Sequence, residues 1–239
     1  MKKILLFILS AIVATSVYAQ EKKYSDHYYK RYAEFEQEAP ITEGDIVLLG
    51  DSLTEGGDWS TYFPKTQAKL GKKGGAIRNR GIVGDTAEGI YDRLDQILPG
   101  KPYKLFFLCG ANDVSHDLPV DTIVARIEKV LCKIKEECPK TKLYLQSMLP
   151  FNESFKRYRK LDGKTYMVAL INAELERVAK KHKIKFINRG KSGDRITDVY
   201  ARIKEDIINL KPDGMSILIG VNDVSHELTM NCGVSPKKF

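Results

Sequence analysis

The stretch Leu48-Leu49-Gly50-Asp51-Ser52-Leu53-Thr54 decides the fold of this 239-residue chain. It continues an apolar run that begins at Ile46, and a short apolar run ending at Gly-Asp is typical of a buried parallel strand. The residues after it indicate a tight turn into a helix, with Ser52 at the turn. A serine in this place is a candidate nucleophile, although Gly-Asp-Ser also occurs in ordinary turns and helix N-caps.

Two further polar turns have the same setting. They are Asn79-Arg80-Gly81-Ile82-Val83-Gly84-Asp85-Thr86 and Gly110-Ala111-Asn112-Asp113, and the latter directly follows a second apolar strand. In an open parallel sheet, ligands bind beyond the carboxyl ends of the strands, so we expect these turns to converge on the serine. An ester carbonyl attacked by serine develops a negative oxygen. The backbone N–H groups of Ser52 and Gly84 and the side-chain amide of Asn112 could form an oxyanion hole for it.

With these residues in this order, the chain resembles the SGNH, or GDSL, hydrolase family of esterases and lipases. The resemblance covers about residues 40–187 and places Ser52 on the family's nucleophile, Gly84 on its second-block glycine and Asn112 on its third-block asparagine. It implies a flavodoxin-like α/β fold: a three-layer parallel sheet of about five strands with helices on both faces. It also implies ester hydrolysis through an acyl-enzyme, with no cofactor and no metal.

The family's fourth block, Asp-x-x-His, supplies the base that activates the serine and the carboxylate that orients this base. This chain departs from the pattern, because residues 188–239 repeat the second and third blocks, at 79–85 and 110–116. Within the repeat, Asp223 and His226 have the Asp-x-x-His spacing, so they are candidates for the orienting acid and the base. Two partial copies are too few for a solenoid, and a fused or truncated tandem of hydrolase domains is the simpler explanation.

The other three histidines are weaker candidates for the base. His27 lies in a tyrosine-rich segment and His182 ends a lysine-rich helix, so both are expected to be solvated, while His116 belongs to the third block. If no histidine reaches Ser52, the serine stays a weak nucleophile. The alternative function is then a catalytically impaired binding module or a remnant of a tandem hydrolase.

Three residues near the predicted site are candidates for substrate binding. They are Asp51, beside the serine; Trp59, the single tryptophan; and Asn152, in an excursion over 148–163 that is expected to face the substrate. Trp59 could wall a sugar or acyl pocket, or it could pack beside the site. The partner expected from this site is a small-molecule or glycan ester, and one possible use is the deacetylation of a sugar.

Composition and the chain start limit the remaining possibilities. The net charge is +8. Because the lysines are scattered, without the interleaved aromatic residues of a nucleic-acid-binding surface, the sequence does not indicate nucleic-acid binding. Residues 1–19 have the basic start, apolar run and small-residue cleavage site of a signal peptide, which predicts a secreted or periplasmic protein with no membrane span after cleavage. The four cysteines match no zinc spacing and are expected to be free thiols.

The predicted organisation follows the alternation of strands and amphipathic helices, which indicates a parallel sheet. Strands are predicted over 46–50, 75–80, 103–109, 142–147 and 185–188, and helices over 86–98, 120–137 and 166–181. The domains expected are a signal peptide (1–19), a lead-in segment (20–40), the hydrolase domain (41–187) and the partial repeat (188–239). The lead-in segment is either a helix that caps the sheet or a flexible stretch.

Overall fold

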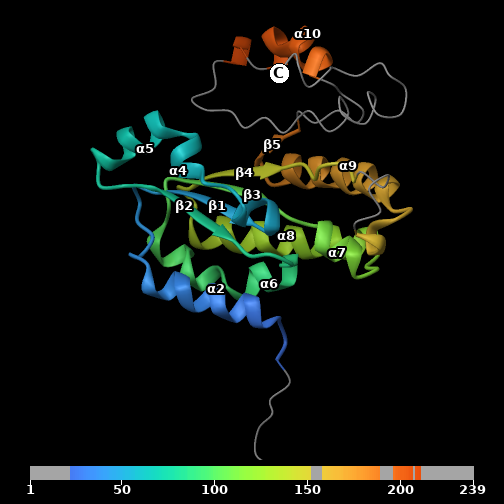
Figure 1. Ribbon diagram of the computed structural model, residues 1–239, viewed down its shortest axis with the longest axis horizontal. Helices are drawn as coiled ribbons and strands as arrows, with labels where there is room; N and C mark the ends of the chain where they lie inside the picture. The colour runs from blue at the N-terminus through green and yellow to red at the C-terminus, as the bar shows by residue number, and fades with distance from the viewer. Residues whose placement is uncertain (1–21, 152–157, 189–195, 207, 211–239) are drawn as a thin grey trace, which may run out of the picture.

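The computed structural model describes residues 22–151, 158–188, 196–206 and 208–210, and within them the strands form one parallel sheet (Figure 1). The strand order is β2-β1-β3-β4-β5, which is the flavodoxin-like order. The predicted α/β fold is therefore confirmed. The strands are β1 Ile46–Gly50, β2 Ile77–Gly81, β3 Lys104–Leu108, β4 Lys142–Gln146 and β5 Lys185–Ile187.

Helices lie on both faces of this sheet (Figure 1). The α-helices of the described part are α2 Asp26–Gln37, α3 Ser52–Glu55, α4 Trp59–Tyr62, α5 Pro64–Gly71, α6 Ala87–Asp92, α7 Ala111–Ser115, α8 Val120–Glu137, α9 Thr165–Lys181 and α10 Ile196–Asp206. Short 3-10 helices are η1 Leu94–Gln96, η2 Leu98–Gly100, η4 Arg159–Leu161 and η5 Ile208–Leu210. None of these helices is both long and apolar enough to cross a membrane.

The main core lies on one face of the sheet. Alternate residues of neighbouring strands point to this face. In the register of β1 with β3, Val47 is opposite Leu105 and Leu49 is opposite Phe107. These side chains are buried in one cluster with apolar residues of α6, α8 and α9. Helix α8 contributes Ile123, Ile127, Val130, Leu131 and Ile134, whose spacing of three and four residues puts them on one helical face. This packing fixes the carboxyl ends of β1 and β3, where the site lies.

The helix predicted over 86–98 is wrong in its second half. Helix α6 ends at Asp92, and the chain continues through the 3-10 turns η1 and η2. Arg93 leaves the helical conformation, with φ −112° and ψ 11°, and its side chain turns into the protein. Pro99 further disfavours an α-helix for the residue before it. The helices predicted over 120–137 and 166–181 are found, as α8 and α9.

Helix α2 precedes the sheet and packs near β2. Ser25 caps it by accepting a hydrogen bond from the Tyr28 N–H (3.1 Å). Tyr28 and Phe35 bury their rings in a small cluster with Ile82, and the Tyr28 hydroxyl donates to the Gly89 carbonyl (2.9 Å). The described part of the lead-in segment is thus largely helical, and it is anchored to the residues that follow β2.

The repeated segment is described only in part. Its helix α10 matches α6 in the sequence, yet the two helices differ in burial. Tyr200 of α10 is 77% exposed, whereas the matching Tyr91 is half-buried and packs against the main core. In the part that the structure describes, α10 therefore does not reproduce the packing of α6.

Candidate active site

The three predicted segments lie at the carboxyl ends of neighbouring strands. Ser52 is the first residue of α3 and is separated from β1 by Asp51; Gly84 lies in the turn after β2; and Asn112 lies in α7, after β3. The Asn112 side-chain amide donates to the Asp85 carbonyl (2.8 Å), which joins the third segment to the second. The sheet order places β1 between β2 and β3, so the serine lies between the other two segments.

Ser52 is exposed on a turn whose backbone is held on both sides. The buried carboxylate of Asp51 accepts a hydrogen bond from the Leu53 N–H (3.0 Å) and caps α3. The Glu55 N–H donates to the Asp51 carbonyl (2.9 Å) and completes the turn. The N–H of Ser52 itself donates to no described residue, so it is open to an incoming oxygen.

Gly84 and Asn112 offer donors of the same kind. Gly84 is an exposed residue with φ +79°, a conformation that side-chain-bearing residues rarely adopt, and its N–H donates to no described residue. The Asn112 amide has two hydrogens, and its bond to the Asp85 carbonyl orients the group while leaving the second hydrogen. Three donors suited to an oxyanion are thus fixed on adjacent turns, and their joint role stays a prediction.

A buried arginine that is not among the predicted site residues holds these turns together. The Arg93 side chain is 0% exposed, and its Nε donates to Asp85 Oδ2 (2.8 Å). Its Nη2 donates to the Gly50 carbonyl (3.1 Å) and the Arg80 carbonyl (3.0 Å). One guanidinium therefore links the ends of β1 and β2 to the second-block turn. A sequence signal existed, because the repeat has an arginine at the matching position, Arg202.

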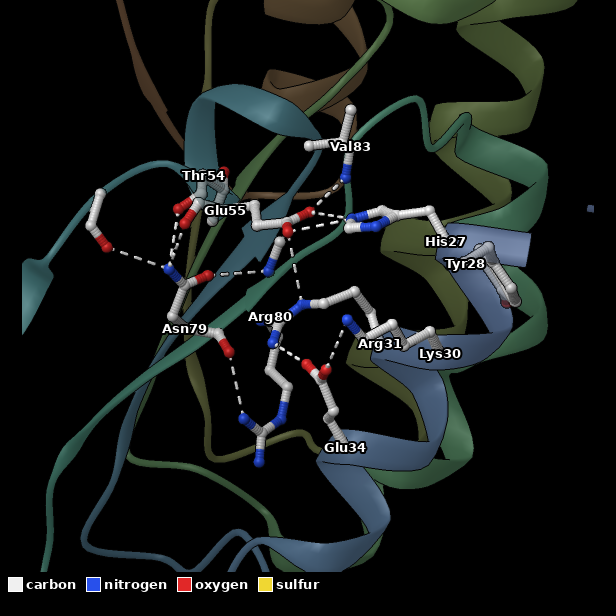
Figure 2. A network of polar contacts seen from close by, with 12 residues as sticks. His27, Tyr28, Lys30, Arg31, Glu34, Thr54, Glu55, Asn79, Arg80 and Val83 are labelled. Atoms are coloured by element: carbon white, nitrogen blue, oxygen red, sulfur yellow. Dashed lines mark hydrogen bonds and ion pairs between the residues drawn. The ribbon is translucent and has the colours of Figure 1, made fainter. Parts of the chain in front are cut away.

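Asn79 ties β2 to the serine-bearing helix (Figure 2). Its Nδ2 lies 2.9 Å from the Thr54 carbonyl oxygen, 3.1 Å from that of Glu55 and 3.0 Å from that of Gly57. Its Oδ1 accepts a hydrogen bond from the Gly81 N–H (2.9 Å). Because the last helical carbonyls lack partners within a helix, this side chain ends α3 as well as positioning it.

Three buried carboxyl groups surround the serine turn. Burial raises the pKa of Asp51 to about 6, helped by the nearby charge of Asp113 and opposed by the Leu53 N–H. Burial also raises the pKa of Asp85 to about 6, against the opposing Arg93 guanidinium. The pKa of Asp113 is likewise raised by burial, although its carboxylate accepts a hydrogen bond from the Ala87 N–H (3.0 Å).

Asp51 makes the stability of the protein depend on pH. Its pKa is about 6 when folded and near 3.8 when unfolded, so between these values the unfolded chain releases a proton that the folded chain keeps. The free energy of unfolding therefore falls as pH rises from about 4 to about 6, by about 3 kcal/mol from this group. Asp51→Asn keeps an acceptor for the Leu53 N–H and does not titrate, so its stability relative to wild type should rise over the same window. Urea unfolding at pH 4, 5, 6 and 7 measures this, and parallel curves for the two proteins would contradict it.

Trp59 packs beside the serine helix. Its Nε1 donates to the Thr54 carbonyl (2.8 Å), and its ring stacks on Phe63 with centroids 6.5 Å apart. The ring also covers Gly57, where an added Cβ would collide with it. These contacts connect α4 to α3, and a role of Trp59 as a pocket wall stays a prediction.

Several predicted residues lie outside the described part of the chain: Asn152, Asp223 and His226. Among the described histidines, His116 is exposed. His27 is exposed, as expected, whereas His182 is partly buried, and each has a carboxylate partner. His27 Nε2 lies 3.0 Å from Glu55 Oε1, and His182 Nε2 lies 2.5 Å from Glu128 Oε1.

One group of side chains of the kinds that bind metal ions lies away from the site, where α8 meets the end of α9. The ligand atoms of Glu128, Cys132 and His182 lie within 4.8 Å of one another. The Lys181 ammonium, 2.9 Å from Glu128 Oε1, already compensates the carboxylate charge, so the group acts as an ion-pair cluster between the helices. The described cysteines, Cys109, Cys132 and Cys138, are free thiols as predicted.

A model of the GDSL-like lipase/acylhydrolase family matches residues 48–188. An acetylxylan esterase from Geobacillus stearothermophilus is 43% identical over 60 residues, which are 25% of this chain and 27% of that protein. The match thus spans about a quarter of the length of that curated relative.

Solved structures with the same fold are consistent with this match. A GDSL-like lipase from Bacteroides thetaiotaomicron is 26% identical, with TM-score 0.54, over 67% of this chain and 77% of that one. A lipase/acylhydrolase from Enterococcus faecalis is 24% identical, with TM-score 0.51, over 67% and 82%. A catalytic mutant of the Geobacillus acetylxylan esterase, altered at a histidine, is 16% identical, with TM-score 0.51, over 74% and 96%.

Proposed function

Because this chain belongs to the GDSL-like lipase/acylhydrolase family, we propose that it is an ester hydrolase that acts through an acyl-enzyme on Ser52. The observation that carries the proposal is the position of the exposed Ser52. Its turn lies between the segments of Gly84 and Asn112, which offer hydrogen-bond donors and are held by buried contacts. Gly84 offers a backbone N–H in a left-handed conformation, and Asn112 offers an amide oriented by the Asp85 carbonyl. These groups are of the kind that acyl transfer requires.

The proposed reaction has two steps. Ser52 Oγ attacks the ester carbonyl carbon while its proton passes to a base, and the oxyanion receives hydrogen bonds from Ser52, Gly84 and Asn112. The intermediate collapses with loss of the alcohol, which takes the proton from the base and leaves an acyl group on Ser52. Water, deprotonated by the same base, then releases the carboxylic acid and restores the serine.

His226, oriented by Asp223, is the candidate for the base. The support is its Asp-x-x-His spacing in the sequence, together with the related acetylxylan esterase whose catalytic mutant is altered at a histidine. The role of His226 as the base is a separate proposal from the role of Ser52, so a substitution of each residue tests one proposal. Export through residues 1–19 is also proposed, on the sequence pattern of that segment.

The substrate we propose is an acetyl ester of a carbohydrate, because the curated relative is named as an acetylxylan esterase. Hydrolysis of p-nitrophenyl acetate should exceed that of p-nitrophenyl octanoate at least tenfold in kcat/KM, and acetylated xylo-oligosaccharides should release acetate. The release is followed by an enzyme-coupled acetate assay. Faster cleavage of octanoate, with no acetate released from the oligosaccharides, would overturn the acetyl-ester proposal while leaving ester hydrolysis in place.

A further inference from the structure

Glu55 lies one helical turn after Ser52, and its carboxylate reaches the turn that carries Gly84. Its side chain is 18% exposed, and Oε2 accepts a hydrogen bond from the Val83 N–H (2.5 Å). Val83 directly precedes Gly84. The helix that bears the nucleophile is therefore bonded, through one carboxylate, to the peptide beside the second oxyanion donor.

The same carboxylate is held from the other side by α2 (Figure 2). His27 Nε2 lies 3.0 Å from both oxygens of Glu55, and Arg31 Nε lies 3.5 Å from Oε1. His27 and Arg31 are four residues apart, so they point from one face of α2. This helix is anchored independently by the buried rings of Tyr28 and Phe35. Glu55 is thus the point at which α2, α3 and the second-block turn meet.

The Val83–Gly84 peptide has little else to hold it. The Val83 side chain is 48% exposed, and a Cβ added at Gly84 would meet nothing within 4 Å, so side-chain packing does not fix this tip. The turn is closed by the Asp85 N–H bonded to the Ile82 carbonyl (3.1 Å). Between Ile82 and Asp85, the hydrogen bond from the Val83 N–H to Glu55 is the one that the backbone makes with the described residues.

We propose that Glu55 is a positioning residue for the oxyanion hole. By fixing Val83 it sets the direction of the Gly84 N–H, and α2 keeps the carboxylate in place through His27 and Arg31. This inference rests on the proposed function, because it assigns Glu55 a role in the same reaction. A charge-assisted hydrogen bond is about twice as strong as a neutral one, which suits it to holding an exposed turn.

Glu55→Ala should lower kcat about tenfold at an unchanged KM, because the Gly84 donor is loosened rather than removed, and removing an oxyanion donor costs about a hundredfold or more. Glu55→Gln should recover most of kcat, because its amide oxygen can still accept from the Val83 N–H. The matched control is Glu34→Ala, which removes another carboxylate paired with Arg31 but does not contact the turn, and it should leave kcat unchanged.

Hydrogen exchange of the Val83 amide, read by NMR or by mass spectrometry of the peptide spanning it, tests the tether without needing turnover. It should quicken about tenfold or more in Glu55→Ala and stay unchanged in Glu34→Ala. Unchanged exchange in Glu55→Ala would overturn the inference. An inactive Ser52→Ala alongside a fully active Glu55→Ala would also overturn it, whereas full activity in Ser52→Ala would overturn the proposed function instead.

Discussion

Ser52→Ala is expected to lower the rate of p-nitrophenyl acetate hydrolysis at least a thousandfold. The substitution removes the atom that forms the acyl-enzyme, and what the oxyanion donors alone supply is only a residual rate. The variant should fold normally, because the exposed side chain of Ser52 makes no hydrogen bond to a described residue. The assay is the release of p-nitrophenolate, corrected for hydrolysis without protein.

Ser60→Ala is the matched control for this experiment. Ser60 is also exposed, lies on the neighbouring helix α4 and bonds Asp58 Oδ1 (3.1 Å), so its loss should leave the rate unchanged. His226→Ala tests the base in the same assay, and its rate of hydrolysis should be at least a hundredfold lower than that of the wild type. A wild-type rate in His226→Ala with an inactive Ser52→Ala would reject His226 alone. Equal rates in wild type, Ser52→Ala and Ser60→Ala would contradict the proposed mechanism.

Arg93→Met is expected to destabilise the protein by about 3–5 kcal/mol, as the removal of one partner from a buried ion pair does. The substitution leaves Asp85 without its cation and the carbonyls of Gly50 and Arg80 without their donor. For a chain of this size the midpoint of thermal unfolding should fall by about 6–20 °C. Calorimetry or thermal circular dichroism at pH 7 measures it.

Arg126→Met serves as the comparison for this stability prediction. Arg126 also contacts acidic residues: its Nη2 lies 3.1 Å from Glu88 Oε2, and its Nη1 lies at the longer distance of 3.9 Å from Asp113 Oδ1, but its side chain is 35% exposed. Its loss should cost at most about 1 kcal/mol. If Arg93→Met costs no more stability than Arg126→Met, Arg93 does not hold the strand ends together.

The strands and the long helices could be predicted because their signals are local. Each strand is a short apolar run bounded by turn residues, and α8 shows its buried face directly in the spacing of its apolar residues. The glycine and asparagine turns could be placed as well, because parallel strands bring their carboxyl ends to one edge of the sheet.

The contacts that hold the site could not be predicted in the same way. Arg93 looks in the sequence like a surface residue of an amphipathic helix, and it becomes a buried link only once β1 and β2 are adjacent. Glu55 resembles a solvated residue in a short helix, and its partners come from α2 and from the turn after β2, up to 28 residues away. The break after α6 has the same cause, since the inward turn of Arg93 competes with continued helix.

Covalent labelling of the purified protein with a fluorophosphonate, followed by mass spectrometry, shows directly whether Ser52 is the nucleophile. We expect one adduct per molecule, located on the peptide that contains Ser52, and no adduct in Ser52→Ala. Labelling elsewhere, or no labelling of the intact wild-type protein under conditions that label a known serine esterase, would contradict a nucleophilic Ser52.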